Sequence, residues 1–247
     1  MFENKSLLEN LWKLEIYDER EILNLSQKNN ISILLSRLLH IRNIDSNNIN
    51  EFLNPDLINN IPDPFTLIDM DKAINRVIQA ISNNEILGII ADYDVDGSTS
   101  ASILYKFLST FSNKIILKIP NRLSEGYGPN MRIMDEMTQS NVSVVFALDC
   151  GTTSNNIIDN KKFKNIDVIV IDHHLSETSL PKVHSIINPN RIDESKNLFS
   201  NMAAVGVTFL FLMGLRKKLR EKDFFNKKIK EPNLLVFLDL VSLGTVC

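Results

Sequence analysis

Four short, continuously apolar runs alternate with stretches of helical length in the middle of the chain. The runs are residues 86–90, 114–119, 142–148 and 167–171, and residues 185–189 are a candidate fifth strand. The intervening stretches are residues 98–111, 129–138 and 153–162. An uninterrupted apolar run suits a strand that is buried on both faces, and strands that alternate with helices favour a parallel sheet. We therefore expect an α/β fold in which helices cover both faces of a parallel sheet.

The stretch before the sheet is predicted to be mainly helical. Apolar residues recur at helical spacing between Ile31 and Leu39, and three prolines between Asn54 and Pro64 indicate a linker. Asp69 is a candidate cap for the next helix, whose apolar face comprises Met70, Ala73, Ile74, Val77, Ile78 and Ile81. We expect a helical N-terminal region with its linker over residues 1–66 and a second domain over residues 67–247.

The second domain is expected to end in two helices. A very apolar one is predicted over residues 202–219, and a last one over residues 232–243. Pro232 near the first turn and Gly244 past the end fit the preferences of those two residue types at helix termini.

The composition fits an ordered protein of a reducing compartment. The chain is 44% hydrophobic with a formal charge of −3, which is too apolar and too balanced for a disordered sequence. Its two cysteines, Cys150 and Cys247, cannot form a disulfide framework. No signal-peptide pattern is present, and the longest nearly apolar run, residues 203–215, is shorter than the ~20 residues that span a bilayer. We expect a cytoplasmic protein without membrane contact, although nucleic-acid binders are usually more basic.

Acidic residues directly follow three of the predicted strands. The groups are Asp92, Asp94 and Asp96 after the first run, Asp149 after the third, and Asp172 with His173 and His174 after the fourth. Because the carboxyl ends of parallel strands meet at one edge of a sheet, at least five carboxylates and two imidazoles should gather there. Their mutual repulsion opposes folding, and bound cations would remove that cost.

The types of side chain at this edge favour particular metals. Carboxylates with a histidine and no obligatory thiolate suit two Mn²⁺ or Mg²⁺ ions better than a structural Zn²⁺. Asp94 and Asp96 are expected to point the same way out of an extended segment, with Asp149 placed to bridge the two ions. Pairs of ions ~3.5–4 Å apart serve phosphoester hydrolysis. Asp239 is a further candidate ligand, because a carboxylate buried in its nearly all-apolar helix needs a partner.

Each of these features also has a purely structural interpretation. The Asp-x-Asp-Gly pattern is common in turns, and Asp149 could cap a helix that begins near Thr153. A pair of histidines is more often structural, and Asp239 could be a hydrogen-bonded core residue. The segment from Asp94 to Ser98 also resembles the nucleophile loop of haloacid-dehalogenase-type phosphatases. Those enzymes need a later lysine and a paired-aspartate strand end, where this chain has Asp-His-His.

The order Asp-x-Asp, lone strand-end Asp and Asp-His-His is similar to that of the DHH phosphoesterase superfamily. Within it, successive motifs resemble those of the RecJ family of single-strand-specific DNA exonucleases. These motifs are GIIADYDVDGSTSASILYKFL, IPNRLSEGYGPN, ALDCGTT, VIVIDHHLSE, INPNR, AAVGVTF and FLDLVSLGTV. Nanoribonucleases, cyclic-dinucleotide phosphodiesterases and family II pyrophosphatases share the aspartates and the Asp-His-His, but not the RLSEGYGPN and VSLGTV context.

The resemblance implies two-metal hydrolysis of single-stranded DNA in the 5′-to-3′ direction, releasing mononucleotides in recombination and repair. It implies metal ligands at Asp94, Asp96, Asp149, His173 and Asp239. It also implies that His174 contacts the scissile phosphate, with Asp92 and Asp172 as groups that orient the ligands. Arg122 is a candidate phosphate contact by resemblance, and its alternative is a surface salt bridge. The family's Gly-rich loop implies close backbone approach to a phosphate at Gly206, although alanines replace other glycines around it.

Two other functions remain open at this point: an oligoribonuclease or cyclic-dinucleotide phosphodiesterase of the same superfamily, and a non-catalytic DNA-binding relative. The basic run over residues 215–230 could follow a DNA backbone or be a solvated helix end. Family members are longer, with a DHH-associated (DHHA1) domain and an OB-fold domain. We therefore expect this chain to be the N-terminal part of a longer protein and to be weakly active by itself. The expected partners of this monomer are single-stranded DNA, a single-strand-binding protein and a RecQ-type helicase.

Overall fold

The computed structural model describes residues 4–5, 10–13, 16–56, 60–112, 114–159, 161–176, 179–194 and 198–247. Contacts within the chain divide it into two compact units, Met1–Pro62 and Asp63–Cys247. Residues 57–59 of the predicted linker, and residue 160 of the helix predicted over 153–162, lie outside the described residues.

The first unit is mainly helical, as predicted. Its helices are α1 (Glu19–Asn29), α2 (Ile33–Ile41) and α3 (Ile49–Leu53). Asp18 caps α1 by accepting from the Arg20 N–H, and Ser32 caps α2 by accepting from the Leu35 N–H. A short antiparallel pair, β1 (Asn4–Lys5) with β2 (Leu11–Trp12), precedes them. Two residues are too few to show an alternating pattern, so this pair was not predicted.

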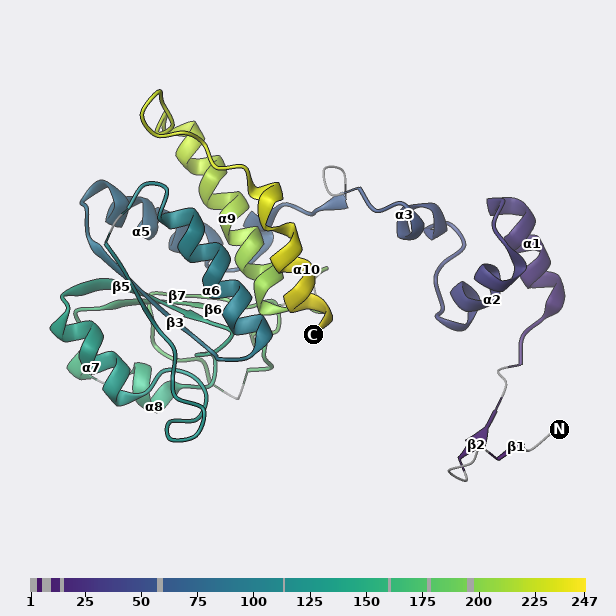
Figure 1. The fold of residues 1–247 in the computed structure, drawn as a ribbon, viewed down its shortest axis with the longest axis horizontal. Helices are drawn as coiled ribbons and strands as arrows, with labels where there is room; N and C mark the ends of the chain where they lie inside the picture. Colours follow the sequence, from purple (N-terminus) through teal and green to yellow (C-terminus); the bar gives the residue numbers. More distant parts are fainter. Residues whose placement is uncertain are drawn as a thin grey trace. The chain divides into compact units, whose positions relative to one another are not determined.

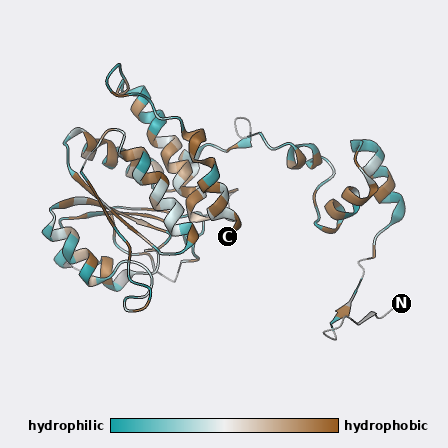
Figure 2. Cartoon of the chain, viewed as in Figure 1, coloured by the Kyte–Doolittle hydropathy of each residue, from teal (hydrophilic) through white to brown (hydrophobic). Residues whose placement is uncertain are grey.

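The second unit is built on a five-stranded, fully parallel sheet in the order β4-β3-β5-β6-β7 (Figure 1). Its strands are β3 (Ile86–Ala91), β4 (Ile115–Lys118), β5 (Val142–Leu148), β6 (Asp167–Ile171) and β7 (Ser185–Ile187). The four predicted strands and the candidate fifth are therefore confirmed. Figure 2 shows the apolar character of the central strands, which are buried on both faces.

Helices cover both faces of this sheet, which confirms the predicted architecture (Figure 1). One face carries α5 (Met70–Ser82), α6 (Val95–Leu108), α9 (Ala204–Glu221) and α10 (Leu238–Val246), and the other carries α7 (Met131–Gln139) and α8 (Asn155–Ile158). Short 3-10 turns are η1 (Pro64–Thr66), η2 (Lys161–Phe163) and η3 (Leu234–Phe237). Side chains of β5 alternate between the two cores: the Phe146 ring meets the Phe211 ring of α9, and Val145 packs with Met137 of α7. Among the described helices, none has both the length and the apolar character needed to cross a bilayer.

The end of the chain differs from the prediction. The helix expected over residues 232–243 is a 3-10 turn followed by α10, and Gly244 lies inside α10 rather than past its end. A Cβ at Gly244 would lie 2.4 Å from Thr99 Oγ1 of α6 and 2.9 Å from Val205 Cγ1 of α9. Gly244 is therefore needed where α10 approaches two other helices, and it does not terminate the helix.

Replacing Gly244 by alanine should destabilise the protein, although alanine favours helix formation more than glycine. The added methyl group must displace Thr99 or Val205, and overpacking of this kind costs about 1–3 kcal/mol. Urea unfolding measures the change in the free energy of unfolding. The matched control is Ser242→Ala, an exposed position of the same helix, where a change within about 0.5 kcal/mol is expected. Equal stability of the two variants would contradict the packing role of Gly244.

Candidate functional site

The strand register brings three aspartates into one row. Ala91 of β3 pairs with Leu148 of β5, and Leu148 pairs with Ile171 of β6. The next residue of each strand is an aspartate, so Asp92, Asp149 and Asp172 lie side by side at the carboxyl edge of the sheet. All three are buried, with exposed fractions of 4%, 2% and 1% in that order. The predicted gathering of carboxylates at one edge is thus observed.

Asp94 and Asp96 join this row from the start of α6, and their arrangement differs from the prediction. Asp94 is the N-cap of α6 and accepts from the Gly97 N–H at 2.9 Å. Asp96 lies in the first helical turn, so the expectation that both side chains leave one extended segment is wrong. The helix begins this early because Gly97 lets it approach the strand end: a Cβ there would lie 2.6 Å from the Asp92 carbonyl oxygen.

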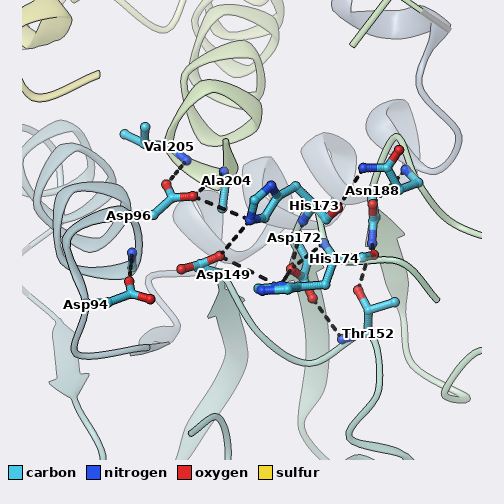
Figure 3. Close-up of polar contacts among 12 residues, drawn as sticks. Asp94, Asp96, Asp149, Thr152, Asp172, His173, His174, Asn188, Ala204 and Val205 are labelled. Atoms are coloured by element: carbon cyan, nitrogen blue, oxygen red, sulfur yellow. Dashed lines mark hydrogen bonds and ion pairs between the residues drawn. The ribbon is translucent and has the colours of Figure 1, made fainter. Parts of the chain in front are cut away.

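The start of α9 holds the Asp96 carboxylate in place. The two carboxylate oxygens of Asp96 accept from the Ala204 N–H and the Val205 N–H, each at 2.7 Å (Figure 3). These are first-turn amides of a helix, which have no partner within the helix itself. Segments more than a hundred residues apart in the sequence are thereby joined at the site.

Asp149 is the least compensated of the carboxylates. It adopts a left-handed backbone conformation with φ 57°, and its Oδ1 atom is buried without a hydrogen-bond partner. Two histidine nitrogens approach Oδ1 from the same side-chain cluster in Figure 3: His173 Nε2 lies 3.4 Å away and His174 Nδ1 lies 3.8 Å away. His173 Nε2 is also 3.6 Å from Asp96 Oδ2. Among the described residues, Asp149, His173 and His174 offer ligand atoms within 4.8 Å of one another.

Burial in a cluster of like charges raises the pKa of these carboxyl groups. Burial is the main cause at Asp149 and raises its pKa to about 7, while the contact with His173 opposes the shift. Burial likewise raises the pKa of Asp92 to about 6 and the pKa of Asp96 above its ordinary value. The site therefore disfavours the ionised carboxylates in the absence of a cation.

Asp172 is compensated by its own loop. Its oxygens accept from the N–H groups of Thr152 at 3.1 Å, His173 at 2.7 Å and His174 at 3.2 Å, and Oδ1 lies 2.7 Å from His174 Nδ1. Burial acts to raise the pKa of Asp172, but these hydrogen bonds outweigh it and hold the pKa below its usual range. The contact between Asp172 Oδ1 and His174 Nδ1 also raises the pKa of His174 to about 9. The contact with Asp149 raises the pKa of His173.

The row of carboxylates lines a cavity of about 370 Å³. Its walls include Asp92, Asp94, Asp149, Asp172, His174 and Tyr127. Asp92 also accepts from the Gly128 N–H at 2.8 Å, so it anchors the RLSEGYGPN loop beside the cavity. Asp92 therefore lies in the row of aspartates and also fixes the RLSEGYGPN loop to the sheet edge.

Arg122, in the same loop, lies outside the carboxylate cluster. It is exposed, and its guanidinium lies 5.4 Å from the centroid of the Tyr93 ring. The ring centroids of Tyr93 and Tyr127 are 4.5 Å apart, and Tyr127 lines the cavity. The phosphate contact expected of Arg122 stays a prediction.

Gly206 and Asp239 both lie in helices, and the substrate contact expected of Gly206 stays a prediction. Gly206 is buried in the first turn of α9, and its N–H donates to the Ala203 carbonyl at 2.9 Å. Its amide is therefore already engaged. Asp239 is exposed on α10 and accepts from the adjacent Leu240 N–H at 2.7 Å, so the expectation of a buried carboxylate is wrong. Its role as a metal ligand stays a prediction from the resemblance.

Two asparagines at the site were not predicted as functional residues. Asn188 donates to the His174 carbonyl and Asn190 donates to the His173 carbonyl. Both follow β7, the fifth strand of the same sheet, and this position at a strand end could have identified them. They were missed because the prediction considered only ionisable side chains at the strand ends, and asparagine amides are neutral.

Comparison with known proteins agrees with this geometry. The family model "DHH family, N-terminal domain" matches residues 86–245. The single-stranded-DNA-specific exonuclease RecJ of Dickeya dadantii is 35% identical over 180 residues, which are 71% of this chain and 31% of that protein. RecJ of Bacillus subtilis is 29% identical over 235 residues, which are 95% of this chain and 28% of that protein.

Solved structures show the same fold. A crystal structure of exonuclease RecJ bound to manganese matches with 26% identity and a TM-score of 0.62, covering 75% of this chain and 43% of that one. RecJ from Thermus thermophilus in complex with Mn²⁺ matches with 21% identity and a TM-score of 0.69, covering 94% of this chain and 31% of that one.

The chain belongs to the DHH family, because the family model covers most of it. Its similarity to RecJ exonucleases, expected from the motifs, is confirmed along most of its length. The chain spans about a third of the length of these RecJ relatives.

Replacing Asp149 by asparagine should stabilise the metal-free protein at pH 8. The pKa of Asp149 is raised to about 7 in the folded state, so the unfolded state ionises at a lower pH than the folded state. The free energy of unfolding therefore falls as the pH rises from about 4 to about 7 and stays low above that. Asparagine does not ionise, so it removes this loss of stability. Urea unfolding with a chelator present should show a gain on the order of 1–3 kcal/mol at pH 8, shrinking as the pH falls toward 4. A variant that is less stable than the parent at pH 8 would contradict the electrostatic account.

Proposed function

We propose that this chain carries the metal-dependent active site of a 5′-to-3′ exonuclease that hydrolyses phosphodiester bonds in single-stranded DNA. One observation carries the proposal: a buried carboxylate oxygen of Asp149 lacks a hydrogen-bond partner and faces a histidine nitrogen. A charged oxygen is costly to bury in this state, and a divalent cation removes the cost.

The donor set fits Mn²⁺ or Mg²⁺. Asp149 Oδ1 is 3.4 Å from His173 Nε2, which is 3.6 Å from Asp96 Oδ2. Two ligand atoms that each lie about 2.1 Å from one ion are about 3 Å apart at an octahedral angle, so small movements would allow shared coordination. Carboxylate oxygens with an imidazole suit Mn²⁺ and Mg²⁺. We propose Asp94, Asp96, Asp149 and His173 as ligands of two such ions.

The chain's own residues would then bind and orient the phosphodiester. Asp172 engages Nδ1 of His174, which leaves Nε2 as the ring nitrogen available to a phosphate oxygen. The contact with Asp172 raises the pKa of His174 to about 9 in the metal-free site, so the ring there holds its proton at neutral pH and offers a charged donor. Asp92 holds the loop of Arg122 and Tyr127 through the Gly128 N–H. When bound, two divalent ions would supply an activated water and neutralise charge on the leaving oxygen.

The substrate assignment is supported by the relatives. Those described above are called single-stranded-DNA-specific exonucleases, and two structures of such proteins are described with manganese. We propose residues 67–247 as the catalytic domain. From the resemblance we further propose a cytoplasmic monomer that meets a single-strand-binding protein and a RecQ-type helicase.

Metal binding should stabilise the fold. If Mn²⁺ binds the folded state and neutralises the repulsion among the carboxylates, adding it at about a hundred times its dissociation constant should stabilise the folded state by about 2.7 kcal/mol. The thermal midpoint should then rise by several degrees. A chelator should reverse the shift. Asp149→Ala should abolish it, whereas Asp71→Ala, an exposed aspartate on α5, should retain it. An equal shift in both variants would place the ion elsewhere.

Nuclease activity tests the substrate assignment. With Mn²⁺, the protein should release labelled mononucleotide from a 5′-labelled single strand and leave duplex DNA and a dinucleotide largely uncleaved. Asp149→Ala should lower the rate by at least about 100-fold, because a ligand-deficient site cannot hold the ions that carry the chemistry. Asp71→Ala is again the control. Preferential cleavage of the dinucleotide would instead favour a small-substrate phosphodiesterase.

A further inference from the structure

The row of residues at the sheet edge extends by one strand beyond the aspartates. Ile171 of β6 pairs with Ile187 of β7, so the next residue, Asn188, follows Asp172 in the same row. Asn188 is 1% exposed. Its Nδ2 donates to Thr152 Oγ1 and to the His174 carbonyl, each at 2.9 Å (Figure 3). Asn188 therefore ties together the two loops that follow β5 and β6.

Asn190 makes a parallel set of contacts. Its Nδ2 donates to the His173 carbonyl at 2.7 Å and to the Ser200 carbonyl at 3.0 Å. Its backbone N–H donates to Asn188 Oδ1 at 2.8 Å, which orients the Asn188 amide so that its nitrogen faces the His174 carbonyl. Arg191 fixes the same segment to the sheet by donating to the Ile186 carbonyl at 2.6 Å.

The backbone of the two histidines is thus held at both its donors and its acceptors. Asp172 accepts from the N–H groups of His173 and His174, and the two asparagines donate to their carbonyl groups. Fixing both sides of successive peptide groups restricts the backbone dihedrals that aim the rings. His173 is thereby directed toward Asp149 and Asp96, and His174 toward Asp172.

We propose that Asn188 and Asn190 are positioning residues that aim His173 and His174 through their backbone carbonyls. The inference rests on the proposed metal-dependent function, because the affected quantity is the fit of His173 to the ion. Residues that orient metal ligands from outside the ligand set typically change metal affinity 10- to 100-fold when removed.

The test compares Asn190→Ala and Asn188→Ala with the parent protein and with Ile74→Val. Ile74 is a buried residue of α5 that packs near Gly214 of α9, so Ile74→Val should lower stability without removing a hydrogen bond to His173 or His174. Mn²⁺ affinity is measured by titration at a temperature where circular dichroism shows each variant to be folded. Asn190 is only partly buried, so Asn190→Ala carries the test if Asn188→Ala does not fold. The expected result is about 10-fold weaker Mn²⁺ binding in the asparagine variants and unchanged binding in Ile74→Val.

Hydrogen exchange of the metal-free proteins separates this inference from the proposed function. The His173 and His174 amides should lose protection in the asparagine variants, while the Ile169 amide of β6 keeps it. Mn²⁺ affinity within about twofold of the parent in a folded Asn190→Ala variant would overturn the positioning role. If the parent protein binds no Mn²⁺, the proposed function fails, and hydrogen exchange alone decides: unchanged protection of the two histidine amides overturns the inference.

Discussion

The repulsion among carboxylates at the carboxyl edge of a parallel sheet shapes the rest of this structure. The register aligns Asp92, Asp149 and Asp172 in one row, and α6 adds Asp94 and Asp96. A parallel sheet offers no way to separate these side chains, because every strand ends on the same side. The fold must therefore compensate each charge locally or supply a cation.

Most of the compensation comes from backbone N–H groups at loop and helix starts. Asp94 is satisfied by the first turn of α6, Asp96 by the first turn of α9, and Asp172 by the loop it belongs to. Asp149 differs, because its Oδ1 has no hydrogen-bond donor and its pKa rises to about 7. The uncompensated position is the centre of the row, where contacts with His173 and His174 converge. This difference sets Asp149 apart from a carboxylate that caps a helix terminus, whose oxygen accepts from a backbone N–H.

The strands and the acidic residues that follow them were predictable from local sequence, and the row of aspartates followed because the carboxyl ends of parallel strands meet at one edge of a sheet. A continuously apolar run followed by an acidic residue identifies a buried strand and its end, as at Val142–Leu148 with Asp149. The error at Asp239 came from treating an apolar helix as buried all round. In the structure that part of the chain leaves several apolar side chains exposed, among them Leu235, Leu243 and Val246. Gly244 was misplaced for a related reason, since helix-to-helix approach depends on distant partners that no local pattern reveals. The asparagine contacts were missed because their targets are backbone carbonyls, which every residue possesses.

The central claim is that the uncompensated Asp149 oxygen belongs to a metal site shared with His173. Anomalous diffraction from crystals soaked in Mn²⁺ tests it most directly, because manganese scattering locates the ion independently of any assay. We predict a peak within about 2.3 Å of both Asp149 Oδ1 and His173 Nε2, with Asp96 or Asp94 completing the coordination. A well-occupied peak elsewhere, or none at this row with Asp149 Oδ1 still unpartnered, would contradict the claim.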